Sequence, residues 1–315
     1  MSIKLAGLHH VTAVADNPQE NVDFYSGVLG LRLVKKTVNF DDPGSYHLYY
    51  GDAAGNPGTI MTFFSWPGAP RGHIGTGQVS ATSFAVPEDS LGYWTERLVE
   101  HGVRFERPKR RFDETVLAFD DPDRLAVELV ARPGRNGGEA PEGPVPAEHA
   151  IRCISGVTLS ERSGEVTADL LANFLGFEKV EEEDGRTRYL TAGSGGSYAD
   201  VLKWPAGPVG RVAVGTVHHV AWRAPDEETQ EAWREELVDR GFHVTPVLDR
   251  SYFRSIYFRE PGGVLFEIAT DPPGFAIDED EEHLGESLKL PPWLEKDRER
   301  IERVLPPVHR TQQSS

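Results

Sequence analysis

Three segments of the sequence carry residue types that could bind a transition metal together. The dipeptide His-His occurs twice, at His9-His10 and His218-His219, and Glu267 lies in the apolar stretch 264–268. Two imidazoles and one carboxylate are the protein ligands of non-haem Fe(II) oxygenases, and they leave coordination positions open. Because side chains alternate across a strand, we expect only one histidine of each pair to face a shared site.

The elements that must position these residues recur four times along the chain. Each repeat reads as a strand, a helix and three further strands. In the first repeat, Asn17, Pro18 and Glu20 mark the start of the helix and Gly30 marks its end. The helix ends match pairwise, repeat one with three and repeat two with four. The repeats span about residues 6–67, 77–133, 151–205 and 215–272. We call them modules one to four.

Equivalent positions can be compared between the modules. The prolines that close the last strands align Thr62, Glu128, Asp200 and Glu267, and the first strands align His10, Ala81, Gly156 and His219. A metal shared by the two histidines and Glu267 therefore requires modules one and four to pair. Modules two and three supply carboxylates without imidazole, so we expect no transition-metal site there and interpret Glu128 and Asp200 as structural.

Four βαβββ modules, two of which begin with His-His, resemble the vicinal oxygen chelate superfamily of glyoxalases and extradiol dioxygenases. The resemblance covers the chain to about residue 275. It implies an α+β fold in which paired modules form two open barrels. We expect N-terminal and C-terminal domains at 1–135 and 150–275, each with two modules, and a tail at 276–315.

The residue at the fourth ligand position separates two kinds of reaction. A glyoxalase-like isomerase fills all four positions with protein ligands, whereas an oxygenase needs open positions for substrate and O₂. Thr62 is a poor ligand. The sequence therefore favours a three-ligand site.

The segments 31–42, 46–51 and 249–258 resemble dioxygenases that cleave the ring of para-hydroquinones. The resemblance implies that His10, His219 and Glu267 bind iron. It also implies that five residues surround the aromatic substrate: His9, Thr12, His218, Arg250 and Tyr257.

Physical roles follow for four of these five residues. A hairpin would bring the Tyr257 hydroxyl towards the metal, and Arg250 can stabilise negative charge. His9 or His218 can act as acid and base near neutral pH. An ion pair of Arg250 with Asp249 or Glu260, and a packing role for Tyr257, remain alternatives.

We therefore expect an Fe(II)-dependent ring-cleaving dioxygenase that takes an aromatic substrate and O₂, as in the catabolism of aromatic compounds. Mn(II) accepts the same ligands. Two alternatives stay open, a metal-dependent isomerase or lyase and a non-catalytic protein that binds aromatic compounds or drugs on the same fold. The ring substituents and the oligomeric state, including a homo-oligomer, stay open as well.

The composition of the sequence argues against several kinds of partner and compartment. The 315 residues carry a formal charge of −17, which argues against nucleic acid and anionic membranes. No signal peptide or membrane span is apparent, and the single cysteine, Cys153, excludes an intrachain disulfide framework. We expect a cytoplasmic protein in which Cys153 is a buried thiol.

The remaining candidates fit no repeat position. Four aromatic residues could line a pocket or fill the core, namely Phe64, Trp66, Trp222 and Phe253. Seven histidines are expected on the surface or in turns, namely His47, His73, His101, His149, His243, His283 and His309.

Overall fold

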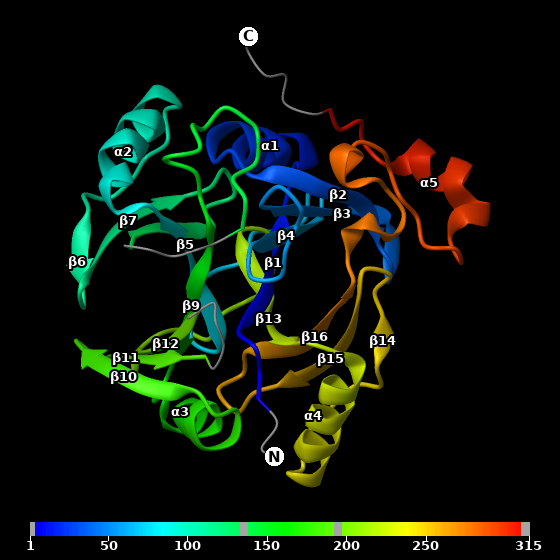
Figure 1. The fold of residues 1–315 in the computed structure, drawn as a ribbon. Coiled ribbons are helices and arrows are strands. Elements are labelled where there is room, and N and C mark those ends of the chain that lie inside the picture. The colour runs from blue at the N-terminus through cyan, green and yellow to red at the C-terminus, as the bar shows by residue number, and fades with distance from the viewer. Residues whose placement is uncertain (1–3, 133–137, 192–196, 310–315) are drawn as a thin grey trace.

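The computed structural model describes residues 4–132, 138–191 and 197–309, which form two curled eight-stranded sheets (Figure 1). The strands are β1 Leu8–Ala15, β2 Arg32–Asn39, β3 Asp42–Gly51, β4 Ile60–Ser65, β5 Gln78–Val86, β6 Lys109–Arg111, β7 Glu114–Asp120, β8 Ala126–Ala131, β9 Cys153–Glu161, β10 Glu178–Glu183, β11 Arg186–Leu190, β12 Tyr198–Lys203, β13 Thr216–Ala224, β14 Leu248–Asp249, β15 Phe253–Arg259 and β16 Leu265–Pro273. The α-helices are α1 Pro18–Val22, α2 Leu91–Glu100, α3 Glu165–Asp169, α4 Glu227–Asp239 and α5 Arg298–Val304.

Each sheet combines two modules. The outer-module sheet joins modules one and four in the order β14-β15-β16-β13-β1-β4-β3-β2. The inner-module sheet joins modules two and three in the order β10-β11-β12-β9-β5-β8-β7-β6. The predicted pairing of modules one and four is confirmed. The domains at 1–135 and 150–275 stay a prediction, and each sheet takes strands from both of those segments.

The strand register confirms the predicted equivalence of the modules. In every module the last strand runs parallel to the first strand. The last-strand residue aligned with Glu267 pairs with a first-strand residue that lies two places after the one aligned with His219. The four pairs are Thr12 with Thr62, Ser83 with Glu128, Thr158 with Asp200 and Ala221 with Glu267.

The helices follow the predicted pairwise match. Modules one and three have a short α-helix continued by a π-helical turn, at Asp23–Val28 and Leu170–Phe174, whereas modules two and four have regular α-helices. The Asn17 side chain caps α1, and Gly30 follows the π-turn with a φ of 69°, a conformation that glycine adopts without strain. A uniform α-helix up to Gly30 was expected, and the wider π-turn replaces its second half.

The first β-hairpin, β2–β3, has a two-residue turn. Asn39 pairs with Asp42, so the turn consists of Phe40 and Asp41. Its tip lies close to the C-terminal tail, because the rings of Phe40 and Trp293 are 5.6 Å apart.

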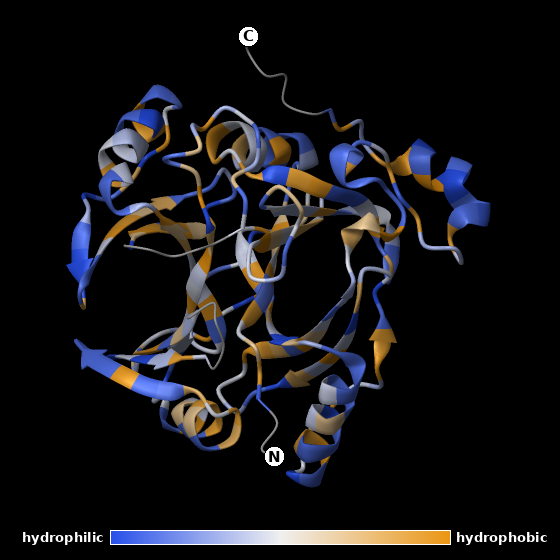
Figure 2. Ribbon diagram, in the orientation of Figure 1, coloured by the Kyte–Doolittle hydropathy of each residue, from blue (hydrophilic) through white to orange (hydrophobic). Residues whose placement is uncertain are grey.

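The C-terminal tail packs along β2. Buried Lys35 binds Asp278 and Glu279 at 2.6 Å each, and Thr37 Oγ1 donates to the Lys289 carbonyl at 2.7 Å. Apolar residues recur along the strands of both sheets, whereas α5 shows mainly hydrophilic ones (Figure 2). The tail thus reinforces the edge of the outer-module sheet. Within the described residues, no helix is long and apolar enough to cross a membrane.

Candidate metal centre

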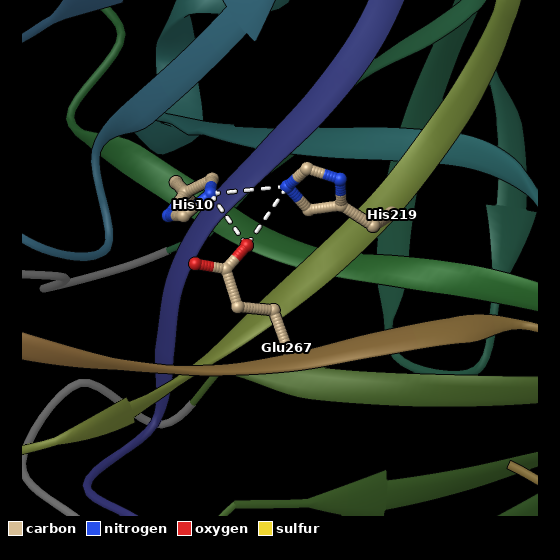
Figure 3. A group of neighbouring side chains, drawn as sticks. All are labelled: His10, His219 and Glu267. Atoms are coloured by element: carbon tan, nitrogen blue, oxygen red, sulfur yellow. Dashed lines mark hydrogen bonds and ion pairs between the residues drawn. The ribbon is translucent and has the colours of Figure 1, made fainter. Parts of the chain in front are cut away.

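Three strands of the outer-module sheet bring the predicted ligands together. His10 on β1, His219 on β13 and Glu267 on β16 converge on one point (Figure 3). The two Nε2 atoms are 3.3 Å apart, and Glu267 Oε2 lies 3.3 Å from His10 Nε2 and 2.9 Å from His219 Nε2. All three side chains are buried. In the described part of the chain, no other group of three or more histidine, cysteine or acidic side chains has this arrangement.

The electrostatics of Glu267 fit a cation at this point. Burial alone would raise the pKa of its carboxyl, but His10 and His219 outweigh burial and hold the pKa well below its usual range. Glu267 Oε1 accepts a hydrogen bond from Ser255 Oγ at 2.5 Å. Oε2 is buried without a hydrogen bond of acceptable geometry, although both imidazoles are close. A metal ion would give this ionised, buried oxygen a partner.

The second histidine of each pair lies beside the first because each strand has a β-bulge. Leu8 of β1 pairs with Trp222 of β13, and the next pair is His10 with Ala221. His9 is therefore an extra residue in β1. Further along, Thr12 pairs with His219 and Ala13 with Val217, so His218 is an extra residue in β13. Bulges change the direction of side chains. His9 and His218 therefore lie beside the rings of His10 and His219, and one histidine of each pair belongs to the group with Glu267.

The extra histidines set the tautomers of the ligands. His9 Nε2 lies 3.1 Å from the Thr270 carbonyl, so it carries hydrogen, and His9 Nδ1 lies 2.9 Å from His10 Nδ1. Burial lowers the pKa of His9 to about 3, so its ring is neutral and its Nδ1 accepts from His10 Nδ1. His10 Nε2 is then left with its lone pair for a metal.

The same contact recurs at the other pair. His218 Nδ1 lies 2.8 Å from His219 Nδ1, and burial lowers the pKa of His218 to about 3. Burial thus favours the uncharged form of both rings, and the acid–base role of His9 and His218 stays a prediction.

Arg250 and Tyr257 lie together at the metal centre. Tyr257 pairs with Glu267 across the β15–β16 hairpin, and its ring is 5.6 Å from the His219 ring. Arg250 Nε donates to the Tyr257 hydroxyl at 3.4 Å, and Arg250 Nη1 donates to Asp41 at 3.1 Å. Burial raises the pKa of Tyr257, which keeps its hydroxyl protonated. Thr12 is not among the lining residues of the adjacent cavity, and its hydroxyl contacts Thr62 at 2.9 Å.

A cavity of about 30 Å³ adjoins the metal centre. Phe64 and Phe253 line it, whereas Trp222 belongs to the core. His47 also lines it, so the expectation of a surface or turn position for His47 is wrong. The alternation of His47 and Tyr49 on β3, opposite Phe64 and Thr62, is the sequence signal that could have identified both. The full lining is His10, Asn39, Phe40, Asp41, His47, Tyr49, Phe64, His219, Arg250, Phe253 and Tyr257.

The inner-module sheet holds ion pairs at the equivalent positions. Arg111 binds Glu128 through two hydrogen bonds of 2.7 and 2.5 Å, and Arg188 binds Asp200 at 2.8 and 3.0 Å. Bidentate arginine contacts satisfy both carboxylates without a metal. The structural interpretation of Glu128 and Asp200 fits these contacts.

Comparison with known proteins gives one family. The model of the "Glyoxalase/Bleomycin resistance protein/Dioxygenase superfamily" matches residues 7–129 and 157–268. The chain is 50% identical to the Bacillus subtilis protein "Putative ring-cleaving dioxygenase MhqO", over 98% of each chain. It is 34% identical to the chlorohydroquinone/hydroquinone 1,2-dioxygenase of Sphingobium indicum, over 96% of each chain.

Solved structures support the same fold. A crystal structure of a "putative dioxygenase" from Bacillus subtilis has a TM-score of 0.95 and 48% identity, covering 99% of this chain and 100% of that one. Glyoxalase I from Zea mays has a TM-score of 0.63 at 15% identity, covering 84% of this chain and 92% of that one. The second likeness concerns the fold alone.

Proposed function

Because the chain belongs to the glyoxalase/bleomycin resistance protein/dioxygenase superfamily, we propose that it is an Fe(II)-dependent ring-cleaving dioxygenase for hydroxylated aromatic compounds, with substituted hydroquinones as substrates. The observation that carries the proposal is the convergence of two imidazoles and one carboxylate, with Thr62 at the fourth position. The similarity to a hydroquinone 1,2-dioxygenase supports the substrate class.

Each residue at the centre has a role in this proposal. His10, His219 and Glu267 would hold the iron, and Mn(II) accepts the same ligands. Bound iron would bring O₂ and a phenolate oxygen together and transfer electrons between them. His9 and His218 fix the ligand tautomers.

Two further side chains act on the substrate. The protonated Tyr257 hydroxyl donates a hydrogen bond to a substrate oxygen, and Arg250 stabilises the negative charge of a deprotonated phenol. Arg250 is suited to this role because its guanidinium keeps its charge at any physiological pH.

We infer that the β2–β3 turn moves when the substrate enters. A cavity of about 30 Å³ has the volume of about one water molecule, which is less than an aromatic ring needs. Asp41 in the turn holds Arg250 at 3.1 Å across the cavity, and Asp41 is 74% exposed. Because water solvates the Asp41 carboxylate, opening this ion pair would cost little. The turn is therefore the element that admits the ring.

The arrangement disfavours a glyoxalase-like isomerase. Such an enzyme needs a fourth protein ligand, but the Thr62 hydroxyl is engaged by Thr12 and His47 at 2.9 and 2.7 Å. A non-catalytic protein that binds aromatic compounds would have no need of three converging ligands.

The test is oxygen consumption by the reconstituted protein. Full-length protein loaded with Fe(II) without oxygen, and then mixed with air-saturated buffer, should consume one O₂ per substituted hydroquinone and release a ring-opened acid. Catechols should react more weakly. Iron-loaded protein that consumes no O₂ with any hydroquinone but converts a hemithioacetal would show that the isomerase alternative is correct.

A further inference from the structure

A chain of hydrogen bonds occupies the fourth ligand position. Thr62 Oγ1 lies 2.9 Å from Thr12 Oγ1 and 2.7 Å from His47 Nε2, and the Tyr49 hydroxyl lies 2.8 Å from His47 Nδ1. Thr12, Thr62 and Tyr49 are at most 1% exposed. We call Thr12, Thr62, His47 and Tyr49 the Thr62 chain.

The repeat shows that the Thr62 chain occupies a supporting position built into the fold. Tyr49 pairs with Thr62 across the β3–β4 hairpin, as Tyr257 pairs with Glu267 across the β15–β16 hairpin. His47 lies two residues before Tyr49, and its counterpart in module four is Ser255, which donates to Glu267 Oε1. Module one therefore supports Thr62 from the position that module four uses to hold its carboxylate ligand.

The Thr62 chain has one hydrogen-bond donor more than it has contacts between its members. Burial, and after it His10, His219 and Arg250, lower the pKa of His47 well below its usual value, so its ring is neutral and carries one N–H. The three hydroxyls carry one hydrogen each, which gives four donors for three contacts. With the hydrogens in head-to-tail order, the spare hydroxyl hydrogen lies at one end of the chain, on Thr12 or on Tyr49.

The surroundings of the two ends decide between them. Thr12 is completely buried, and Thr62 is the one side-chain partner of its hydroxyl within the described residues. A spare hydrogen on Thr12 would be a buried donor without an acceptor, which is unfavourable. Tyr49 lines the cavity at the metal centre, where a substrate oxygen could accept. The favourable order therefore runs from Thr12 through Thr62 and His47 to Tyr49.

We infer that His47 is a positioning residue that, as the Nδ1–H tautomer, donates to the Tyr49 oxygen and so directs the Tyr49 hydroxyl hydrogen at the substrate. Tyr49 then contacts the substrate directly, and Tyr257, its counterpart in module four, lines the same cavity. This inference rests on the proposed function, since the acceptor is an oxygen of the aromatic substrate. Thr62 contributes by occupying His47 Nε2.

The test compares two substitutions of Thr62. Thr62→Val keeps the shape of the side chain but removes the hydroxyl that His47 Nε2 needs, and Thr62→Ser keeps the hydroxyl. With Fe(II)-loaded protein and a substituted hydroquinone, we expect Thr62→Val and Tyr49→Phe to lower kcat/KM about 10-fold, the value of one hydrogen bond. Thr62→Ser should stay near wild type, and iron content should not change.

A second readout does not depend on turnover. In full-length protein labelled with ¹⁵N-histidine and loaded with diamagnetic Zn(II), the ring ¹⁵N shifts of His47 should show a neutral Nδ1–H tautomer at pH 7. The signals are assigned by their loss in His47→Gln. Thr62→Val should shift the tautomer towards Nε2–H, and Thr62→Ser should not.

The outcomes separate the inference from the proposed function. A cationic or Nε2–H His47 in the wild type would overturn the inference, as would wild-type kcat/KM in both Thr62→Val and Tyr49→Phe. If the wild type consumes no O₂ but the tautomer is Nδ1–H and depends on the Thr62 hydroxyl, the order of the chain is supported and the dioxygenase proposal fails.

Discussion

At the scale of single residues, the two histidines of each pair have different tasks. His10 and His219 point their Nε2 atoms at the centre. If those atoms keep their lone pairs for a metal, the Nδ1 atoms of His10 and His219 donate to His9 and His218. Removing such a partner leaves the ligand present but free to adopt the wrong tautomer. Loss of a hydrogen-bond partner of this kind costs about 10–100-fold in metal affinity.

We therefore expect His9→Ala to weaken Fe(II) binding about 10–100-fold and His10→Ala to abolish it. Affinity is measured by competition with a chelator under anaerobic conditions. His73→Ala, a substitution of an exposed histidine, is the control. Equal affinity of His9→Ala and wild type would contradict the assigned tautomers.

The Tyr257 hydroxyl should matter for turnover and not for metal binding. Removing one such donor costs about 10²–10³-fold in kcat where it stabilises developing charge, so we expect a loss of this order for Tyr257→Phe at full iron occupancy. Tyr252→Phe is the matched control, because the Tyr252 hydroxyl donates to Asp278 and not into the cavity. A similar loss in both variants would point to packing as the cause.

At the scale of elements, the order of the strands could be predicted, but the local geometry at the metal centre could not. The repeat aligned Thr62 with Glu267 correctly, because every module keeps the same register. No particular residue type marks the bulges at His9 and His218 in the sequence. In the inner-module sheet they fall at Ser80 and Ser155, which are chemically unlike histidine. His47 was misplaced because its role depends on a contact with Thr62 on the neighbouring strand, and β3 was not included when the first and last strands were aligned.

A carboxyl pair lies between elements of the two sheets. Glu161 ends β9, and Glu260 begins the β15–β16 turn and accepts hydrogen bonds from Thr167, Gly262 and Val264. Burial, and then the charge of Glu260, raise the pKa of Glu161 from 4.5 to about 8. The folded protein therefore holds a proton that the unfolded chain loses above pH 4.5.

The sign of the pH dependence follows from this linkage. Because the folded state binds more protons than the unfolded state between pH 4.5 and about 8, the contribution of Glu161 to the free energy of unfolding should fall as pH rises through this range. Glu161→Gln should make denaturant unfolding less dependent on pH, whereas Glu165→Gln, at an exposed position, should not. An unchanged slope in Glu161→Gln would mean that the pair is ionised.

At the scale of the whole molecule, each sheet needs both halves of the chain. β1 pairs with β13 and β5 pairs with β9, so fragments 1–135 and 138–315 each hold half of both sheets. Neither fragment should bind Fe(II) with the affinity of the intact chain. Co-expressed, they should associate and restore the metal site, as measured by co-purification and iron content. Full affinity in fragment 1–135 alone would contradict the shared site.

The same topology orders events on the ribosome. The strands of the inner-module sheet are consecutive in synthesis, from Gln78 to Lys203, whereas His10 on β1 must wait for Glu267 on β16. Pairing between distant segments is slower than pairing between near ones. The inner-module sheet can thus be complete while β1 still has an unpaired edge, and the group of His10, His219 and Glu267 cannot form before the last strand emerges. If the protein binds iron as proposed, iron loading would be a late step of biogenesis. The newly made first module would depend on the rest of the chain for protection against aggregation.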